Sequence, residues 1–295
     1  MAIRTFHREE ITRFLQKQYS CQGWDLTLPA GTGHETYIAR LDQFALFIKL
    51  GVEIKRYRVA AAMELTPPVL TSGHLEDGTS LIIQPFITGI RPSRKEYHQH
   101  IEEFANAITR LHGCLELQQL LSGVASDTFS EAGLRSLEAI RSKWELYRPL
   151  VPGEAPFVDE KMEYIKVQID NFKGSGLVAS HNDICNYNWL LSKEGQLFLL
   201  DLDAMSLDDP ALDIGATLWW YYPPNLHPKF LEITGHLGDP EISNRMQVRM
   251  ALHCLNIELP RSNSFDTFDP DKFGDYLVDF KAVLAGEENP QGYEV

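Results

Sequence analysis

The chain has 295 residues, 44% of them hydrophobic and 23% charged, with a formal net charge of -14; this is the composition of a globular protein long enough for one large domain or two lobes. An acidic surface repels nucleic acids and anionic membranes, so neither is an expected partner. It would tolerate or attract a cationic substrate, but solubility alone is the better explanation of the charge. The four cysteines show no C-x-x-C spacing, the N-terminus has no apolar leader, and no apolar run approaches the roughly 18 residues of a membrane span, so we expect a cytoplasmic protein of open oligomeric state.

Strand-like patterns dominate the first part of the chain. Residues 44–50 form an apolar run that contains one charge, Lys49. Pro67 and Pro68 end a helical pattern, because the residue before a proline is pushed out of the α region. We therefore expect residues 1–88 to form a unit of their own, made of a small sheet and one inserted helix. The predicted strands are 24–28, 36–39, 44–50, 69–72 and 80–87, and the predicted helices are 7–19 and 53–65.

Helical periodicity dominates the rest of the chain. Gly89 and Pro92 mark a linker, and apolar side chains then recur about every 3.6 positions. Asp209 and Pro210 are the residue types expected at a helix cap and at the first helical position. We therefore expect residues 89–295 to form a second, mainly helical domain. The predicted helices are 96–122, 129–148, 156–173, one that begins at 210, 242–256 and 271–285.

The segment from His181 to Asn188 reads H-x-D-x4-N and lies between two short apolar runs. Phosphoryl transfer to a hydroxyl needs a carboxylate that accepts or orients the hydroxyl proton, and Asp183 has the type and the loop position for this. The amide oxygen of Asn188 could ligate magnesium. Taken alone, each could equally be a turn residue, and His181 is better explained as a structural hydrogen-bonding residue.

A second acidic pair follows the apolar residues 197–200. A charge directly after four apolar residues is costly unless it meets a partner or a metal, so we expect Asp201 to be the primary metal ligand. Asp203 would point to the same side in an extended chain. It is either a second ligand or a hydrogen-bonding support.

Three features of the first part would suit a nucleotide. Lys49 needs a partner inside its apolar strand, and an ATP phosphate with a helix carboxylate would serve, unless the strand is an edge strand that exposes it. Glu53, at the start of the next helix, is preferred as that carboxylate over Glu64, near its end. Gly31 and Gly33 could let backbone N–H groups approach phosphates, although a hairpin turn explains them as well.

Gln84, Pro85 and Phe86 close the last predicted strand before the linker. Because proline has no N–H, a backbone hydrogen bond to an adenine would come from a neighbour, and Phe86 is the first candidate; the alternative is an edge strand that carries a proline. Asp213, in the helix that begins at residue 210, is expected to be a buried support that hydrogen-bonds the loop around Asp183.

Together these motifs resemble the aminoglycoside phosphotransferase and choline kinase family over roughly residues 20–222. The resemblance implies an α+β, protein-kinase-like fold with a small antiparallel-sheet lobe of five strands, a hinge and a mainly helical lobe. Many family members have Gly at the position of Asn182, and other residues than Cys185, Asn186 and Tyr187 between the Asp and the Asn of the loop. The motifs that carry the resemblance are His181-x-Asp183-x4-Asn188, Asp201-x-Asp203 and Asp209-Pro210-x-x-Asp213.

The same resemblance implies ATP and Mg²⁺ as cofactors. It makes Asp183 the catalytic base and places Lys49 at the α- and β-phosphates. It makes Asn188 and Asp201 the metal ligands, and it places the adenine at the backbone around residues 84–87.

The leading hypothesis is transfer of the γ-phosphate of ATP to a hydroxyl of a small molecule. A cationic acceptor, an aminoglycoside or an amino alcohol, could meet carboxylates at Glu258, Asp266 and Asp269, and a sugar or another metabolite stays open. The alternative is a catalytically silent, kinase-like nucleotide-binding or scaffold protein, but all the chemically required side chains are present. A protein kinase is less expected, because the chain has no A-P-E-like segment and carries Asp-x-Asp in place of Asp-Phe-Gly.

Overall fold

The structure of this protein is a computed structural model that describes residues 2–29, 36–122, 128–260 and 267–294. The chain divides into two compact units, the first made of residues 1–91 and 189–203 and the second made of residues 92–188 and 204–295. The chain thus enters the first unit again directly after Asn188 and leaves it directly after Asp203. The expected division after residue 88 does not anticipate this return, and as a division into functional lobes it stays a prediction.

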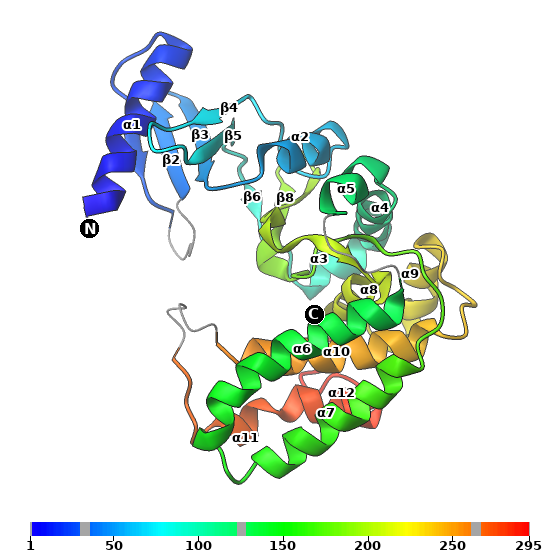
Figure 1. The fold of residues 1–295 in the computed structure, drawn as a ribbon. Helices are drawn as coiled ribbons and strands as arrows, with labels where there is room; N and C mark the ends of the chain where they lie inside the picture. The colour runs from blue at the N-terminus through cyan, green and yellow to red at the C-terminus, as the bar shows by residue number, and fades with distance from the viewer. Residues whose placement is uncertain (1, 30–35, 123–127, 261–266, 295) are drawn as a thin grey trace. The chain divides into compact units, whose positions relative to one another are not determined.

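The first unit is built on a five-stranded antiparallel sheet with the order β1-β2-β3-β5-β4. Helix α1 (Ala2–Tyr19) lies beside it (Figure 1) and packs Ile11 and Leu15 into one core with Ile48 and Leu81 of the sheet. The predicted sheet is confirmed, and its third strand has the predicted bounds. The strands are β1 (Asp25–Thr27), β2 (Thr36–Leu41), β3 (Phe44–Leu50), β4 (Thr71–His74) and β5 (Ser80–Pro85).

One helix, α2 (Ile54–Ala62), is inserted between β3 and β4. It begins after Glu53, whose carboxylate accepts the backbone N–H of Lys55 at 3.1 Å. It ends earlier than the predicted residue 65, because Glu64 adopts a left-handed backbone conformation with φ of 57°.

A second, three-stranded antiparallel sheet completes the first unit, in the order β6-β8-β9. Its strands are β6 (Gly89–Ile90), β8 (Trp189–Ser192) and β9 (Leu197–Leu199). A Cβ at Gly89 would collide with the carbonyl oxygen of Leu191, so this pairing needs glycine. Strands β8 and β9 form a hairpin directly after the H-x-D-x4-N segment.

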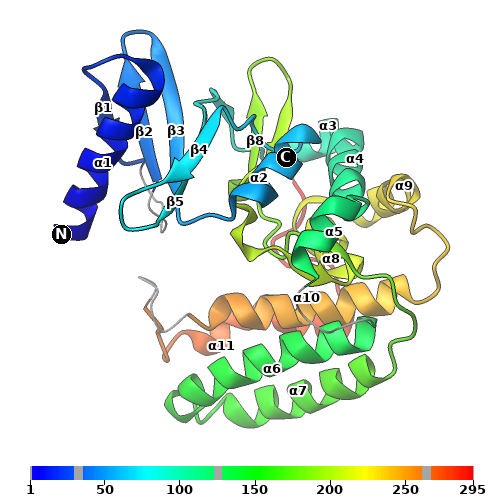
Figure 2. The same cartoon turned by 45° about the horizontal axis from the view of Figure 1, so that its top comes forward.

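The second unit is mainly helical. Helices α6, α7 and α10 lie side by side (Figure 2) and share a hydrophobic core with α12, to which Trp144, Val158, Leu255 and Phe280 belong. A short antiparallel pair, β7 (Val178–Ser180) with β10 (Ser206–Asp208), accompanies the helices. The helices are α3 (Arg94–Gln99), α4 (Ile101–His112), α5 (Leu115–Leu121), α6 (Phe129–Tyr147), α7 (Ala155–Asp170), α8 (Pro210–Tyr221), α9 (His227–Ile233), α10 (Ile242–Glu258), α11 (Phe273–Tyr276) and α12 (Val278–Ala285).

Two of the predicted helices are wrong in their continuity. The predicted helix 96–122 is three helices, because His100 leaves the helical conformation and Gly113 with the extended Cys114 separates α4 from α5. The predicted helix 271–285 is likewise divided at Leu277 into α11 and α12.

The predicted fold class is confirmed, since an antiparallel-sheet part precedes a mainly helical remainder. Within the described residues, none of the helices combines the length and the apolar character needed to span a bilayer.

Candidate active site

The loop that carries the H-x-D-x4-N motif follows β7 and is anchored by Asp213, a buried carboxylate on α8. Asp213 accepts the backbone N–H of His181 on Oδ2 at 2.8 Å and that of Asn182 on Oδ1 at 2.9 Å. The Nε2 atom of His112 lies 3.0 Å from Oδ2. Burial acts to raise the pKa of Asp213, but the hydrogen bond and charge of His112, with the charge and backbone N–H of His181, hold this pKa below its ordinary value. The predicted support of the loop by Asp213 is confirmed.

The backbone conformation of Asn182 explains why this residue can stand where many family members have Gly. Its φ is 65°, in the left-handed region that Gly adopts freely and Asn tolerates better than most residues. Its side chain also holds the loop in place, because Nδ2 donates to the backbone oxygen of Ala204 at 2.9 Å and to Oγ of Ser206 at 2.8 Å.

The two chemically important side chains of this loop meet in the second unit. Nδ2 of the buried Asn188 donates to the backbone oxygen of Asp183 at 2.8 Å and to its Oδ2 at 3.0 Å. The carboxylate of Asp183 is therefore oriented from one side while the residue itself is exposed. The contact uses the amide nitrogen of Asn188 and not its oxygen, the atom type that can ligate magnesium.

Tyr221 supports the same loop from the end of α8. Its hydroxyl accepts the backbone N–H of Asn186 at 2.6 Å, and its ring stacks on Tyr97 with 3.9 Å between the centroids. Burial raises the pKa of Tyr221, so the hydroxyl stays neutral. Tyr221 thus packs against α3 and positions the loop.

Lys49 lies at the centre of a polar cluster in the first unit. Its Nζ lies 2.6 Å from Oδ1 of Asp201, 2.8 Å from Oδ2 of Asp203 and 2.9 Å from the hydroxyl of Tyr57 on α2. Burial acts to lower the pKa of Lys49, but the phenol and the two carboxylates raise it above its ordinary value, so the side chain is an ammonium group at neutral pH. Burial raises the pKa of Tyr57 to about 12, so the phenol is neutral.

The sequence predicts an extended chain around Asp201, but the structure shows a turn there. Asp201 has φ of 56°, and Leu202–Ala204 form a turn of 3₁₀ helix, so the predicted same-side geometry of a strand is wrong. The two carboxylates nevertheless meet at Lys49. The hydroxyl of Tyr57 fixes this turn because it accepts the backbone N–H of Leu202 at 3.2 Å.

The expected pair between Lys49 and a helix glutamate is wrong within the described residues. Glu53 caps α2, and Glu64 lies beyond the end of that helix. The positive charge of Lys49 is instead neutralised by Asp201 and Asp203, which leaves a carboxylate at the helix start for the α2 dipole.

The other residues expected at the nucleotide either use their hydrogen-bonding groups within the fold or lie outside the described residues. The N–H of Phe86, predicted to be available for an adenine, is donated to the backbone oxygen of Ala45 at 3.0 Å, since pairing with β3 continues past Pro85. The side chain of Gln84 is buried and donates to the backbone oxygen of Pro67. Gly31 and Gly33 lie outside the described residues.

A sequence model of the phosphotransferase enzyme family matches residues 18–247, which is most of the chain. This protein belongs to the phosphotransferase enzyme family. Its fold is also similar to those of several solved structures, all at low sequence identity, so these likenesses concern the fold.

Three such structures illustrate the similarity. A putative aminoglycoside phosphotransferase from Ralstonia eutropha superposes with a TM-score of 0.70 at 13% identity, over 94% of this chain and 98% of that one. A choline/ethanolamine kinase family protein from Mesorhizobium loti gives 0.66 at 18% identity, over 98% and 96%. A spectinomycin phosphotransferase in complex with ADP and spectinomycin gives 0.63 at 14% identity, over 94% and 97%.

Several residues that position the site of this phosphotransferase family member could not be recognised in the sequence. Tyr57 and Tyr221 look like ordinary core aromatics, and nothing local marks the hydrogen bonds of their hydroxyl groups. A signal did exist on α10, where Arg245, Arg249 and His253 recur every four positions and therefore share one helix face. Charged residues on a face that packs into the core need partners, and this pattern could have indicated a polar site.

Replacing Asp213 by Asn should destabilise this phosphotransferase family member by about 3 kcal/mol at pH 7, because the carboxylate is buried and serves three donors. Its folded-state pKa lies below the unfolded value, so the stabilisation is complete above the unfolded pKa and is lost as the pH falls through the folded pKa. The difference in the free energy of unfolding between wild type and variant, measured by urea denaturation, should therefore become smaller below about pH 4. If this difference stayed the same at low pH, the charge of Asp213 would not be the cause of the stabilisation.

Proposed function

We propose that this protein transfers the γ-phosphate of ATP to a hydroxyl group of a small molecule, with Mg²⁺ as the metal cofactor. Membership of the phosphotransferase enzyme family supports phosphoryl transfer as the reaction class. The acceptor hydroxyl and the roles of single residues are parts of the proposal that rest on the chemistry of the site.

The observation that carries the proposal is the geometry of Asp183. An exposed carboxylate is held by Asn188 in a loop that the buried Asp213 fixes through two backbone N–H groups. A base for phosphoryl transfer needs this combination of access and fixed orientation, because it must meet the acceptor hydroxyl in one geometry. We assign to Asp183 the role of orienting the hydroxyl and accepting its proton.

Side chains of the sequence motifs would hold the nucleotide and the metal. Asp201 and Asn188 would ligate Mg²⁺, with Asp203 as a second carboxylate, since carboxylate and amide oxygens are the donors that this ion prefers. A carboxylate that accepts from Lys49 keeps acceptor capacity for a cation. When bound, Mg²⁺ would neutralise charge on the phosphates. Lys49 would contact the phosphates as a fixed ammonium group.

The base of the nucleotide would lie against the backbone near the end of β5, and the segment with Gly31 and Gly33 would approach the phosphates. Because the N–H of Phe86 is used within the sheet, a carbonyl oxygen or another N–H of residues 84–87 would serve the base. The solved spectinomycin phosphotransferase is described with ADP and spectinomycin, which makes a nucleotide and a polyhydroxylated acceptor reasonable first ligands.

Acceptor-dependent release of ADP tests the proposal. The protein should release ADP from ATP when a suitable hydroxyl compound is present, and chelation of Mg²⁺ should abolish the release. Aminoglycosides, amino alcohols, sugars and hydroxy acids form the screen. A catalytically silent protein would bind ATP without acceptor-dependent ADP release from any of these compounds, and that outcome would favour the alternative.

A further inference from the structure

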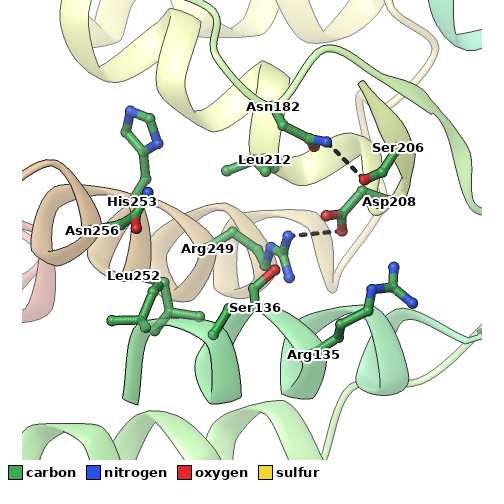
Figure 3. A pocket seen from close by; sticks show the side chains of 12 residues that line it. Arg135, Ser136, Asn182, Ser206, Asp208, Leu212, Arg249, Leu252, His253 and Asn256 are labelled. Atoms are coloured by element: carbon green, nitrogen blue, oxygen red, sulfur yellow. Dashed lines mark hydrogen bonds and ion pairs between the residues drawn. The ribbon is translucent and has the colours of Figure 1, made fainter. Parts of the chain in front are cut away.

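A cavity of about 250 Å³ lies within the second unit, between α6, α8, α10 and β10 (Figure 3). It is smaller than the roughly 300–1,000 Å³ of pockets that enclose drug-sized ligands, so it suits a small metabolite or one end of a larger one. Its polar lining includes Arg135 of α6, Asp208 of β10 and Arg249 of α10.

The lining is positively charged although the whole chain is acidic. Two arginines and one aspartate line the cavity, so the fixed charges sum to +1, in a chain whose formal net charge is -14. The one carboxylate is already committed, because Oδ1 of Asp208 accepts from Nη2 of Arg249 at 2.7 Å. As far as the structure describes the chain, the lining thus offers no uncommitted carboxylate to a cationic ligand.

Arg249 carries the decisive observation. The residue is 1% exposed, and its Nε and Nη1 atoms are buried without a hydrogen-bond partner among the described residues. Guanidinium N–H groups can only donate, and a buried donor without an acceptor is costly. Arg135 lies on the opposite helix, where Nη2 donates to the backbone oxygen of Leu207 at 2.9 Å. Because Arg249 itself lines the cavity, an oxyanion bound there would lie beside a guanidinium group that has N–H donors to spare.

The cavity adjoins the loop that carries the proposed base. Asn182, which precedes Asp183 in the chain, lines it, and so does His253 of α10. Burial lowers the pKa of His253, and the negative charges of Asp183 and Asp213 partly oppose this, so the ring lies within electrostatic reach of the Asp183 carboxylate. A ligand in the cavity could therefore present a hydroxyl group near Asp183.

Glu258 and Asp269, two of the residues first considered for a cationic acceptor, do not line this cavity. Burial and the nearby Asp279 raise the pKa of Glu258 to about 7, so its carboxyl is only partly ionised at neutral pH. Asp269 lies 3.3 Å from the ammonium of Lys272, and Asp266 lies outside the described residues.

We propose that the phosphate acceptor carries an oxyanion, a carboxylate or a phosphate, besides its hydroxyl group, and that Arg249 and Arg135 bind this oxyanion in the cavity. This substrate class rests on the proposed function. It replaces the cationic acceptor expected from total charge, because the local charge of the lining and not the charge of the whole chain determines which ligand is stabilised there.

The test compares matched compounds that differ in an oxyanion. The pairs are glycerate with glycerol, serine with ethanolamine and carnitine with choline, and glycerol 3-phosphate provides the phosphate arm. Calorimetric binding to the whole protein without nucleotide should favour the carboxylate-bearing member of each pair by roughly tenfold or more. In the presence of Mg-ATP, the kcat/KM of transfer should show the same preference, and the glycerate and glycerol 3-phosphate arms separate the two oxyanions.

Three variants assign the preference to the cavity. Two variants change the cavity: Arg135→Gln, and the charge-balanced double variant Asp208→Asn/Arg249→Gln. Each should reduce, by roughly tenfold, the ratio of the binding constants of the members with and without the oxyanion. Arg141→Gln is the control, since Arg141 lies on the same helix but pairs with Glu163 and does not line the cavity. The ratio is the readout because a merely structural loss would lower both members of a pair alike.

The outcomes separate this inference from the proposed function. Anionic preference in binding without any transfer would support the cavity assignment and contradict the proposed function. Transfer to neutral or cationic compounds, with equal or weaker binding of the anionic ones, would overturn the cavity assignment and leave the function intact. An anionic preference that survives in both cavity variants, or no binding of any oxyanion probe, would also overturn it.

Discussion

Replacing Asp183 by Asn should lower kcat for phosphoryl transfer by about three orders of magnitude, within the range of roughly 10²–10⁴ that general base catalysis contributes. The amide keeps the size of the side chain and can still accept from Nδ2 of Asn188, which contacts Oδ2 at 3.0 Å in the wild type. It cannot accept the proton of the acceptor hydroxyl. The loop should keep its shape, because Asp213 and not Asp183 anchors its backbone.

The measurement pairs steady-state transfer with nucleotide binding. Asp183→Asn should bind Mg-ATP about as well as the wild type, so the loss should appear in kcat. Asp170→Asn is the matched control, since Asp170 is an exposed aspartate of the second unit that pairs with Lys166, and its loss should leave kcat unchanged. Full turnover by Asp183→Asn would show that Asp183 is not the catalytic base.

Replacing Asp201 by Asn should weaken nucleotide binding by roughly tenfold or more when Mg²⁺ is present, and much less when it is chelated. The substitution removes a charge that a divalent cation would meet. It also removes the shortest contact of Lys49, at 2.6 Å, so the ammonium group loses part of its fixed position. Titration of a fluorescent ATP analogue with and without Mg²⁺ separates the two contributions.

Asp203→Asn is the comparison for this experiment. Asp203 contacts Lys49 at 2.8 Å, so both variants disturb the lysine, but the primary metal ligand is expected at Asp201. The Mg-dependent loss should therefore be larger for Asp201→Asn. A larger loss for Asp203→Asn would reverse the assignment, and equal wild-type affinity with and without Mg²⁺ would contradict the role of the metal in binding.

The regular parts of the fold could be predicted because their signals are local. The apolar run of β3 gave the observed bounds, Phe44–Leu50, and the cap at Asp209 with Pro210 gave the observed start of α8. The support of the loop by Asp213 was also predictable, because a carboxylate inside an apolar helix needs donors nearby. The bounds of β3 and the start of α8 need only neighbours in sequence, whereas the backbone donors of Asp213 lie 31 and 32 positions away.

The partners of Lys49 could not be predicted in this way. Asp201 lies 152 positions away in sequence, whereas Glu53 is a near neighbour, so a local argument favours the wrong carboxylate. The backbone at Asp201 compounds the difficulty. A positive φ is uncommon outside glycine, and no glycine marks this position, so an extended chain was the natural but incorrect assumption.

The charge of the cavity likewise depends on assembly in space. Arg135 and Arg249 come from helices far apart in sequence, and with them the fixed charges of the lining sum to the opposite sign from the chain as a whole. Composition predicts how a surface attracts ligands at a distance. It does not predict which charge a cavity presents once its carboxylate is paired with an arginine.

The central claim, that the chain moves a phosphoryl group from ATP to an acceptor oxygen, is tested most directly by phosphorus NMR of the reaction products. With Mg-ATP and an acceptor that stimulates ADP release, the spectrum should show a phosphate monoester of that acceptor in an amount equal to the ADP formed, and Asp183→Asn should form neither. If ADP appears only with inorganic phosphate, or if no acceptor yields a phosphate ester, the account of this protein as a small-molecule phosphotransferase is contradicted.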